Sequence, residues 1–308
     1  MLRIILSRIL QAFVVVFFLF TVTFFALRAV PGDPFSTDDK SLPPHIKEKM
    51  EAYHGLDKPK LTQYGLSVKN YLFKGDFGLS TSKPGRRVSD IISQSLPASI
   101  LIGLGGIIFA VLLGIPMGII AALKKNSWID YTAMSIAMIG ICVPAFVFGP
   151  LLQIWVASNT TFLNVAGWST PADIILPSIT LGIGTAAYLA RLTRGGMLDI
   201  LSQDYIKTAK AKGVPLRSVI TKHSLKGALL PAITFLGPAF AAIITGSFIV
   251  ETIFGIPGMG QHFVNAVTSK DYALLQGLVI FYGFLMAIAN LLVDLIIVML
   301  NPRLRESS

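Results

Sequence analysis

The chain has 308 residues, of which 53% are hydrophobic and 14% charged, and its mean hydropathy is +0.69. This composition is too apolar and too poor in charge for a soluble globular domain, and it predicts an all-α protein that crosses a membrane several times. The net charge of +10 could indicate nucleic-acid binding. An excess of Lys and Arg is also typical of the cytoplasmic side of membrane proteins, so we expect no nucleic-acid partner.

The sequence offers neither a disulfide nor a recognisable metal site. Cys142 is the one cysteine, and it lies in an apolar run. The histidines are scattered without helical pairing or zinc-type spacing. We therefore expect no bound metal.

The first predicted span covers residues 9–27, which carry no charge and follow Arg3 and Arg8. This apolar run is longer than that of a signal peptide and ends without a clear cleavage site, so residues 1–27 are expected to form a retained anchor helix. Residues 28–97 are rich in charge, Gly and Pro, which predicts a small extracytoplasmic loop domain. We expect it to hold short helices around residues 45–53 and 63–73.

The rest of the chain, residues 98–308, is expected to form a five-helix core. Its apolar runs predict spans at residues 98–123, 131–157, 174–190, 230–250 and 273–300. The first of these runs holds several Gly residues and a Pro. Such residues allow close helix packing in lipid, although a gating hinge is an alternative.

The distribution of Lys and Arg predicts the orientation of these six spans. With the N-terminus in the cytoplasm, the inner tails and short loops carry fourteen Lys and Arg residues, whereas the two short outer loops carry only Lys270. Cytoplasmic loops carry the excess of positive charge in membrane proteins. Both termini are therefore predicted to be cytoplasmic, and so is the basic loop at residues 191–229.

One polar stretch in this loop, residues 203–231, predicts two short basic helices separated by a break at Gly213 and Pro215. Ser202 or Asp204 can cap the first helix, and Gly213 can end it in a left-handed conformation. Lys207 is expected to point outward. The small Ala209 would allow a partner to approach closely, but an amphipathic helix lying on anionic lipid headgroups is an equal alternative.

Two other polar features have less specific readings. Residues 251–263 carry closely spaced Gly and Pro, which predicts a tight re-entrant turn packed over the outer mouth of the bundle, with a plain surface loop as the alternative. Asp294 lies in the last predicted span, seven residues before Asn301, where it could pair near the interface or face a transport path.

At these residues the chain resembles the permease subunits of bacterial ABC importers, specifically the oligopeptide and dipeptide permease family. Residues 207–213 are similar to the signature that forms a helix docking into an ATPase subunit, with Lys207 and Thr208 in place of the usual Glu and Ala. Leu230-Pro231 closes this signature. The resemblance extends over almost the whole chain, through the following motifs: Pro31-Gly32-Asp33-Pro34, Gly55-Leu56-Asp57, Gly75-Asp76-Phe77-Gly78 with Ser80, Pro257-Gly258-Met259-Gly260, Asp271-Tyr272, Gln276-Gly277, Asn290 with Asp294, and Asn301-Pro302-Arg303, where the family usually has Asp-Pro-Arg.

The resemblance implies a type I importer permease in the bacterial cytoplasmic (inner) membrane. Its expected partners are a second homologous permease, two cytoplasmic ATPase subunits and an extracytoplasmic peptide-binding protein. ATP and Mg would be bound by the ATPases, and no cofactor or catalytic residue is expected in this chain. The expected ATPase-coupling residues are Asp204, Tyr205, Lys207, Thr208, Ala209, Lys212 and Gly213, and those of the outer loop or gate are Glu251, Phe254, Pro257, Gly258 and Gly260.

The sequence leaves the cargo open among dipeptides, oligopeptides, glutathione, metal chelates and peptide antibiotics. A self-contained secondary transporter or channel is the alternative function. That alternative predicts ionisable residues at mid-membrane depth and an internal repeat, and the spans show only Asp294 and no repeat.

Overall fold

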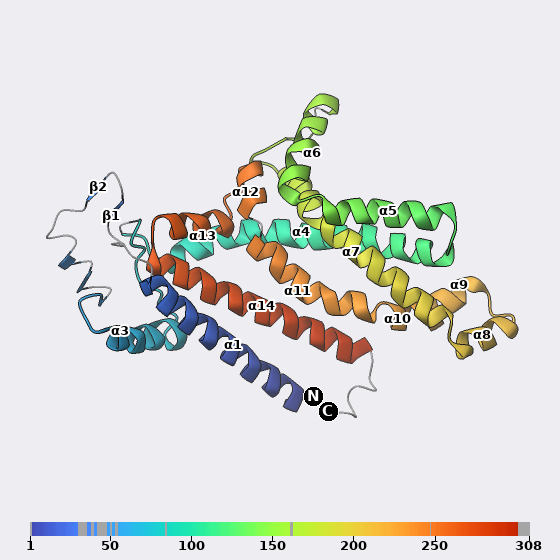
Figure 1. Ribbon diagram of the computed structural model, residues 1–308, viewed down its shortest axis with the longest axis horizontal. Coiled ribbons are helices and arrows are strands. Elements are labelled where there is room, and N and C mark those ends of the chain that lie inside the picture. The colour runs from blue at the N-terminus through green and yellow to red at the C-terminus, as the bar shows by residue number, and fades with distance from the viewer. Residues whose placement is uncertain are drawn as a thin grey trace. The chain divides into compact units, whose positions relative to one another are not determined.

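The computed structural model describes residues 2–29, 36–37, 40–41, 48–49, 51–52, 55–83, 85–160, 163–246 and 248–300. These residues are predominantly helical, as predicted. The principal helices in chain order are α1 (Leu2–Ala29), α3 (Lys60–Ser67), α4 (Val88–Leu123), α5 (Trp128–Cys142), α6 (Ala145–Asn159), α7 (Ile175–Leu201), α8 (Asp204–Ala211), α11 (Leu230–Gly246), α12 (Phe248–Phe254), α13 (Met259–Thr268) and α14 (Tyr272–Leu300) (Figure 1).

Shorter elements connect these helices. The strands β1 (Ser36–Thr37) and β2 (Lys40–Ser41) form a small antiparallel pair. The short helical turns are η1 (Val68–Phe73), η2 (Pro171–Ile174), α9 (Leu216–Ser218), η3 (Val219–Ser224) and α10 (Leu225–Ala228). Several sequence features fall outside the described residues: His45 and most of the helix expected around it, the motif at residues 31–34, and the C-terminal residues 301–308 with Arg303 and Arg305.

Among the described residues, four helical segments are long and apolar enough to cross a membrane, namely Leu6–Ala29, Val88–Leu123, Pro171–Leu201 and Tyr272–Ile296. Two further segments of the described chain are bent pairs, and the number of candidate spans rises to six if each pair is counted as one. One pair, α5 with α6, bends by 108°. The third predicted span, residues 131–157, is therefore not one straight helix.

The bend follows from Pro144, which caps the start of α6. A proline disfavours helical backbone in the residue before it, and Val143 accordingly has φ −81° and ψ 115°. In the region of the fifth predicted span, the described residues form α11, which ends at Gly246, and α12, which begins at Phe248. A helical stretch, Leu216–Ala228, precedes α11 at a bend of 49°.

The described chain divides into two compact units, one formed by residues 2–99 and 257–287 and the other by residues 100–256 and 288–300. In the second unit α7 is the central helix. It packs closely against α4, because a Cβ added at Gly114 or Gly118 of α4 would lie 2.4 Å from the carbonyl oxygen of Ala186 or Ala190 of α7. The small residues of the second predicted span thus serve close helix packing.

The other unit is built around an aromatic cluster on α1. Phe20 and Phe24 are fully buried and pack against Tyr64, Tyr71 and Phe77 of the first loop. The loop helix expected near residues 63–73 is present as α3 and η1. A Cβ at Gly283 of α14 would lie 3.1 Å from Leu19, so α1 and α14 lie side by side there (Figure 1).

Polar contacts hold α3 against α1. Arg28 donates a hydrogen bond from Nε to Oε1 of Gln63 at 2.8 Å, and its guanidinium lies 3.5 Å from the centre of the Phe24 ring. The hydroxyls of Thr21 and Tyr64 are 2.8 Å apart. These contacts fix α3 of the first-loop domain to the C-terminal part of the anchor helix.

Candidate functional site

The predicted basic helix is present as α8, and its C-terminal end has the expected geometry. Gly213 has φ +76°, a left-handed conformation that L side chains rarely adopt. Its N–H donates to the carbonyl of Lys210 at 3.0 Å, and the N–H of Val214 donates to the carbonyl of Ala209 at 3.2 Å. This pair of hydrogen bonds is the Schellman motif, which satisfies carbonyls that the helix end would leave open.

The N-terminal cap was predicted wrongly. The capping residue is Gln203, whose extended backbone has ψ 148° and whose side chain makes no capping hydrogen bond. The hydroxyl of Ser202 instead donates to the carbonyl of Asp199 at 2.8 Å, and Asp204 is already the first residue of the helix. The helix therefore starts without the side-chain cap that the sequence offered.

One face of α8 is buried and the rest is exposed. Ile206 is fully buried, Ala209 is half-buried, and Tyr205 is half-exposed with its hydroxyl 3.4 Å from the carbonyl of His223. The side chains that remain exposed are those of Asp204, Lys207, Thr208, Lys210, Ala211 and Lys212. The helix is thus anchored to its own chain by Ile206 and presents a polar, mainly basic surface.

The charges on this surface leave it open to a partner. Lys207 Nζ lies 2.9 Å from Asp204 Oδ1, and both side chains are exposed. Exposed pairs of this kind contribute only about 0–1 kcal/mol. Lys207 can therefore exchange Asp204 for another acceptor at little cost.

The predicted break after α8 is also present. Residues 212–215 separate α8 from a second helical stretch formed by α9, η3 and α10. Pro215 caps the start of this stretch, which suits its fixed φ and missing N–H. The stretch packs back onto α7, since a Cβ at Gly196 would lie 2.2 Å from the carbonyl oxygen of Ala228.

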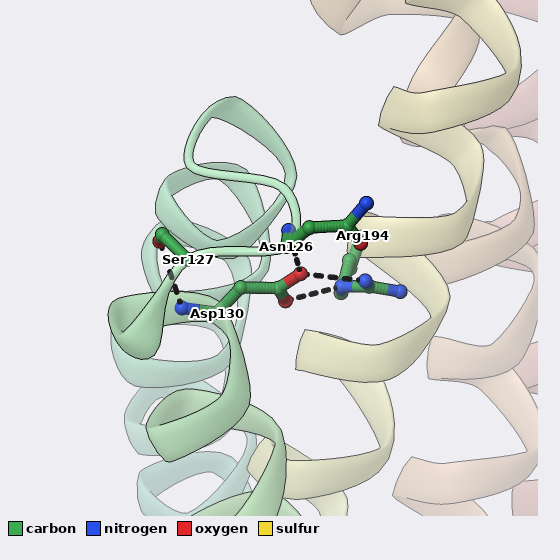
Figure 2. A network of polar contacts seen from close by, with 4 residues as sticks. All are labelled: Asn126, Ser127, Asp130 and Arg194. Carbon is green, nitrogen blue, oxygen red and sulfur yellow. Dashed lines mark hydrogen bonds and ion pairs between the residues drawn. The ribbon is translucent and has the colours of Figure 1, made fainter.

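An ion pair that the sequence analysis missed lies on α7, near its α8 end. Arg194 donates from Nε and one terminal nitrogen to the two carboxylate oxygens of Asp130, at 2.6 and 2.7 Å (Figure 2). Asp130 is only 1% exposed, and its carboxylate also accepts the backbone N–H of Asn126 at 3.0 Å. The hydroxyl of Ser127 caps the same turn by accepting the N–H of Asp130. This site fixes the start of α5 to α7.

The sequence held only a weak signal for this pair. Asp130 is an acid in the first helical turn after a Ser, which is a common capping pattern. Arg194 was counted only among the cytoplasmic positive charges. No local periodicity joins two residues that are 64 positions apart, so the sequence could not pair them.

The predicted outer loop contains more helix than expected. Glu251 and Phe254 lie in α12 and are both buried, and only residues 255–258 form a turn before α13 begins at Met259. The prediction that the whole stretch forms a tight turn was wrong, because Gly260 is tolerated within the first turn of α13. There the N–H of Met259 is satisfied by the hydroxyl of Ser99 at 2.8 Å.

These outer residues belong to both compact units. Glu251 and Phe254 fall in the unit of α7, whereas Pro257, Gly258 and Gly260 fall in the unit of α1. Phe254 packs against α6, with its ring 3.4 Å from the Cβ position of Gly149. Phe254 and Met259 are both buried in protein.

Asp294 lies on α14 and is half-buried. One turn earlier on the same helix, Asn290 contacts α11, where its Oδ1 is 2.9 Å from the Cβ position of Gly237. The structure thus gives Asn290 a packing role at a glycine. A pairing or transport role for Asp294 stays a prediction.

A second buried acid, Asp271, joins two sequence motifs that were noted separately. It is fully buried and accepts hydrogen bonds from the backbone N–H groups of Thr81 and Ser82, both at 3.1 Å, and from both the Ser80 and Ser82 hydroxyls. It also caps α14 by accepting the N–H of Leu274 at 3.0 Å. Burial opposes ionisation of Asp271, but the hydrogen bonds outweigh it and hold its pKa below the ordinary value.

Next to this acid, Lys83 donates from Nζ to Nδ1 of His262 at 3.1 Å. An ammonium group can only donate, so His262 must be neutral and accept at Nδ1. Burial lowers the pKa of His262, and the charges of Lys83 and Arg86 lower it further. Residues 80–83, which we call the docking loop, are thus held to the ends of α13 and α14 by Asp271 and His262.

Within the part of the chain that the structure describes, no group of three or more His, Cys, Asp or Glu side chains is arranged to hold a metal ion. Cys142 is exposed on α5.

Comparison with known proteins decides the family. Residues 114–306 match the model described as binding-protein-dependent transport system inner membrane component, and residues 1–102 match that of the N-terminal part of such membrane components. The chain belongs to this family. As a member, it is an inner membrane component of a transport system.

Curated relatives cover the whole chain. It is 42% identical over 307 residues to the oligopeptide transport system permease protein OppB of Haemophilus influenzae and to that of Escherichia coli, covering 99% of this chain and 100% of each relative. It is 41% identical over 285 residues to the dipeptide transport system permease protein DppB of Bacillus subtilis, covering 92% of both chains.

A solved structure supports the fold. The inward-facing MetNI methionine ABC transporter matches with a TM-score of 0.55 at 16% identity, covering 68% of this chain and 96% of that one. The family member therefore shares the fold of a known ABC transporter chain, and the predicted fold class is confirmed at this level.

Proposed function

We propose that this chain is the permease subunit of an ATP-driven importer for oligopeptides or dipeptides. It would form the translocation path with a second, homologous permease, and an extracytoplasmic peptide-binding protein would deliver the cargo. The relatives named as oligopeptide and dipeptide permeases, which match over nearly the full length of the chain, support this cargo class.

In this proposal two cytoplasmic ATPase subunits bind ATP and Mg, and one of them receives α8. The chain has no Gly-x-x-x-x-Gly-Lys-Ser/Thr phosphate loop, which agrees with ATP hydrolysis on separate subunits. The membrane arrangement is six spans with both termini in the cytoplasm, an anchor at residues 1–27, an extracytoplasmic domain at 28–97, and a core at 98–308 with the coupling loop at 191–229.

The observation that carries the coupling role is the form of α8. It is a short helix, ended by Gly213, anchored by Ile206 and exposed on the side of Lys207 and Thr208. It follows α7 after only two residues, so a force applied to α8 reaches a long membrane helix directly. Closure of the ATPases would displace α8 and shift the bundle between inward-facing and outward-facing states.

The outer residues have a complementary role in the proposal. The first-loop domain and the segment with Glu251, Phe254, Pro257, Gly258 and Gly260 would receive the binding protein and line the outer vestibule. Asp294 is the one acid in the final span and is assigned no role in coupling.

Substitution of Ala209 tests the docking role. Ala209→Trp places a bulky side chain on the half-buried flank of α8 and is expected to abolish uptake of labelled trialanine while the protein remains inserted at normal levels. Thr221→Trp, at an exposed position of η3 in the same loop, is the matched control and should retain uptake. Wild-type uptake by Ala209→Trp would contradict the proposed docking of α8 onto an ATPase subunit.

A further inference from the structure

The ion pair between Asp130 and Arg194 has a geometry that fixes position more strictly than the apolar contacts around it. Both carboxylate oxygens and two guanidinium nitrogens are engaged, and the backbone N–H of Asn126 donates to the same carboxylate (Figure 2). A bidentate Arg–carboxylate pair is planar and tolerates little displacement along the helix. It therefore sets the axial register of α5 against α7.

Elsewhere α5 and α7 contact each other through small residues. A Cβ at Gly140 would lie 3.2 Å from the Cβ of Ala187, and one at Gly184 would lie 3.5 Å from the carbonyl of Gly140. Small residues let helices approach closely in lipid, where no hydrophobic force holds them together. We infer that these apolar contacts define the axial position of α5 less strictly than the directional polar pair does.

Arg194 is also close enough to α8 to move with it. It lies seven residues before Leu201, the end of α7, which is about 10 Å along a helix. Backbone hydrogen bonds continue across the junction, from Ser202 N–H to Leu198 and from Gln203 N–H to Ile200, and Lys207 N–H then donates to Gln203. The junction between α7 and α8 is therefore stiff.

The C-terminal end of α5 leads into α6, so a movement of α5 also moves α6. α5 ends at Cys142, only two residues separate it from α6, and the two helices are bent by 108°. A displacement of α7 that is passed to α5 thus changes the position of this bent pair. Without the ion pair, α7 can shift along its small-residue contacts with α5 while α5 keeps its position.

We propose that Asp130 and Arg194 are a positioning pair that makes α5 follow α8, so that ATP-driven displacement of the coupling helix reaches the bent helix pair α5–α6. This inference rests on the proposed coupling function of α8. Neither residue needs to touch the cargo or the ATPase for this role.

The test uses the assembled transporter with its partner subunits in proteoliposomes and the double variant Asp130→Ala/Arg194→Met. The double variant is chosen because Arg194→Met alone leaves the buried carboxylate of Asp130 unpaired, which can prevent folding for an unrelated reason. Removing both charges avoids that cost while the link stays broken. Asp199→Ala, which removes an exposed acid from the same helix, is the matched control.

The first readout is the amount of labelled trialanine imported per ATP hydrolysed. We expect the double variant to assemble and hydrolyse ATP, but with this ratio lowered about tenfold, within the usual range of coupling between sites. The control should keep the wild-type ratio. A purely structural role for the pair predicts instead that the stable double variant transports like the wild type, and that result would overturn the proposal.

The second readout does not depend on the cargo. Spin labels at Tyr131 on α5 and at the exposed Lys210 on α8, in a Cys142→Ser background, report the separation of the two helices by pulsed EPR. We expect one separation with and without ATP in the otherwise wild-type complex, and an ATP-dependent change in the double variant. An unchanged separation in the double variant contradicts the proposal.

The two proposals fail in different ways. If Ala209→Trp leaves uptake intact, the coupling role of α8 is wrong and this inference falls with it. If Ala209→Trp abolishes uptake while the double variant stays fully coupled, only the positioning role of Asp130 and Arg194 is wrong.

Discussion

Replacing Asp271 should release the docking loop, residues 80–83, from the ends of α13 and α14. In the native protein the buried carboxylate accepts the N–H groups of Thr81 and Ser82 and the hydroxyls of Ser80 and Ser82. Asp271→Ala removes every one of these acceptors at once. Because Ser80 and Thr81 are buried, water cannot fully replace the lost partners.

The size of the effect follows from these contacts. A hydrogen bond to a charged group contributes about 1.5–3 kcal/mol, and leaving a buried donor unsatisfied costs about 1–3 kcal/mol. Ser82 is exposed and can turn to solvent, so we count mainly Ser80 and Thr81 and expect the local opening free energy of the docking loop to fall by about 2–4 kcal/mol.

Hydrogen exchange measured by mass spectrometry on residues 79–87 is the direct assay, because amide exchange reports local opening. Since about 1.4 kcal/mol corresponds to a factor of ten, exchange at Thr81 and Ser82 should accelerate roughly 30-fold or more. Asp76→Ala is the matched control, because the exposed Asp76 accepts only the N–H of Gly78. Unchanged exchange at Thr81 and Ser82 in Asp271→Ala would refute the reasoning.

Two further predictions concern pH and helix packing. The pKa of His262 in the folded protein lies below its ordinary value of about 6.5. The contribution of His262 to docking-loop stability is therefore full above about pH 6.5 and is lost as the pH falls toward the folded pKa. The protonated ring can no longer accept a hydrogen bond from Lys83, and it repels Lys83 and Arg86. The protection factor of residues 80–87, in which the intrinsic pH dependence of amide exchange is divided out, should therefore fall on acidification through pH 6, and His262→Gln should remove this fall; a fall that persists in His262→Gln contradicts the assignment. Gly118→Ala should lower the free energy of unfolding of the purified protein by about 1–3 kcal/mol, because the new Cβ meets the carbonyl oxygen of Ala190 at 2.4 Å. Gly195→Ala should not lower it, because a Cβ at Gly195 meets nothing within 4 Å. Equal stability of these two variants would show that the close approach of α4 to α7 is wrong.

The sequence predicted the apolar helices and the form of α8 well, because these depend on local chemistry. Uncharged runs of about 20 residues locate spans, and Gly213 and Pro215 announce the end of one helix and the start of the next. Where two local signals compete, the prediction was less good. Pro144 and Pro150 both lie in the third predicted span, yet only Pro144 breaks it, while Pro150 is accommodated inside α6.

The long-range polar contacts could not be predicted. Asp130 and Arg194 are distant in sequence, and so are Ser80 and Asp271. Ser80 and Asp271 occur in separate sequence motifs, and only the fold shows that one binds the other. Glu251 was predicted as a residue of the outer loop or gate, and its complete burial follows from the packing of α12, which no local pattern specifies.

The central claim, that α8 docks onto an ATPase subunit, is tested most directly by cross-linking. A cysteine at Thr208, on the exposed side of α8, in a Cys142→Ser background is treated with a short bifunctional maleimide in membranes that contain the whole transporter, with a cysteine at the exposed Thr221 as the control. We expect residue 208 to cross-link to an ATPase subunit, with a yield that changes when ATP is added. Residue 221 should give little or no cross-linked product. Absence of any product from residue 208, with the transporter assembled and active, would contradict it.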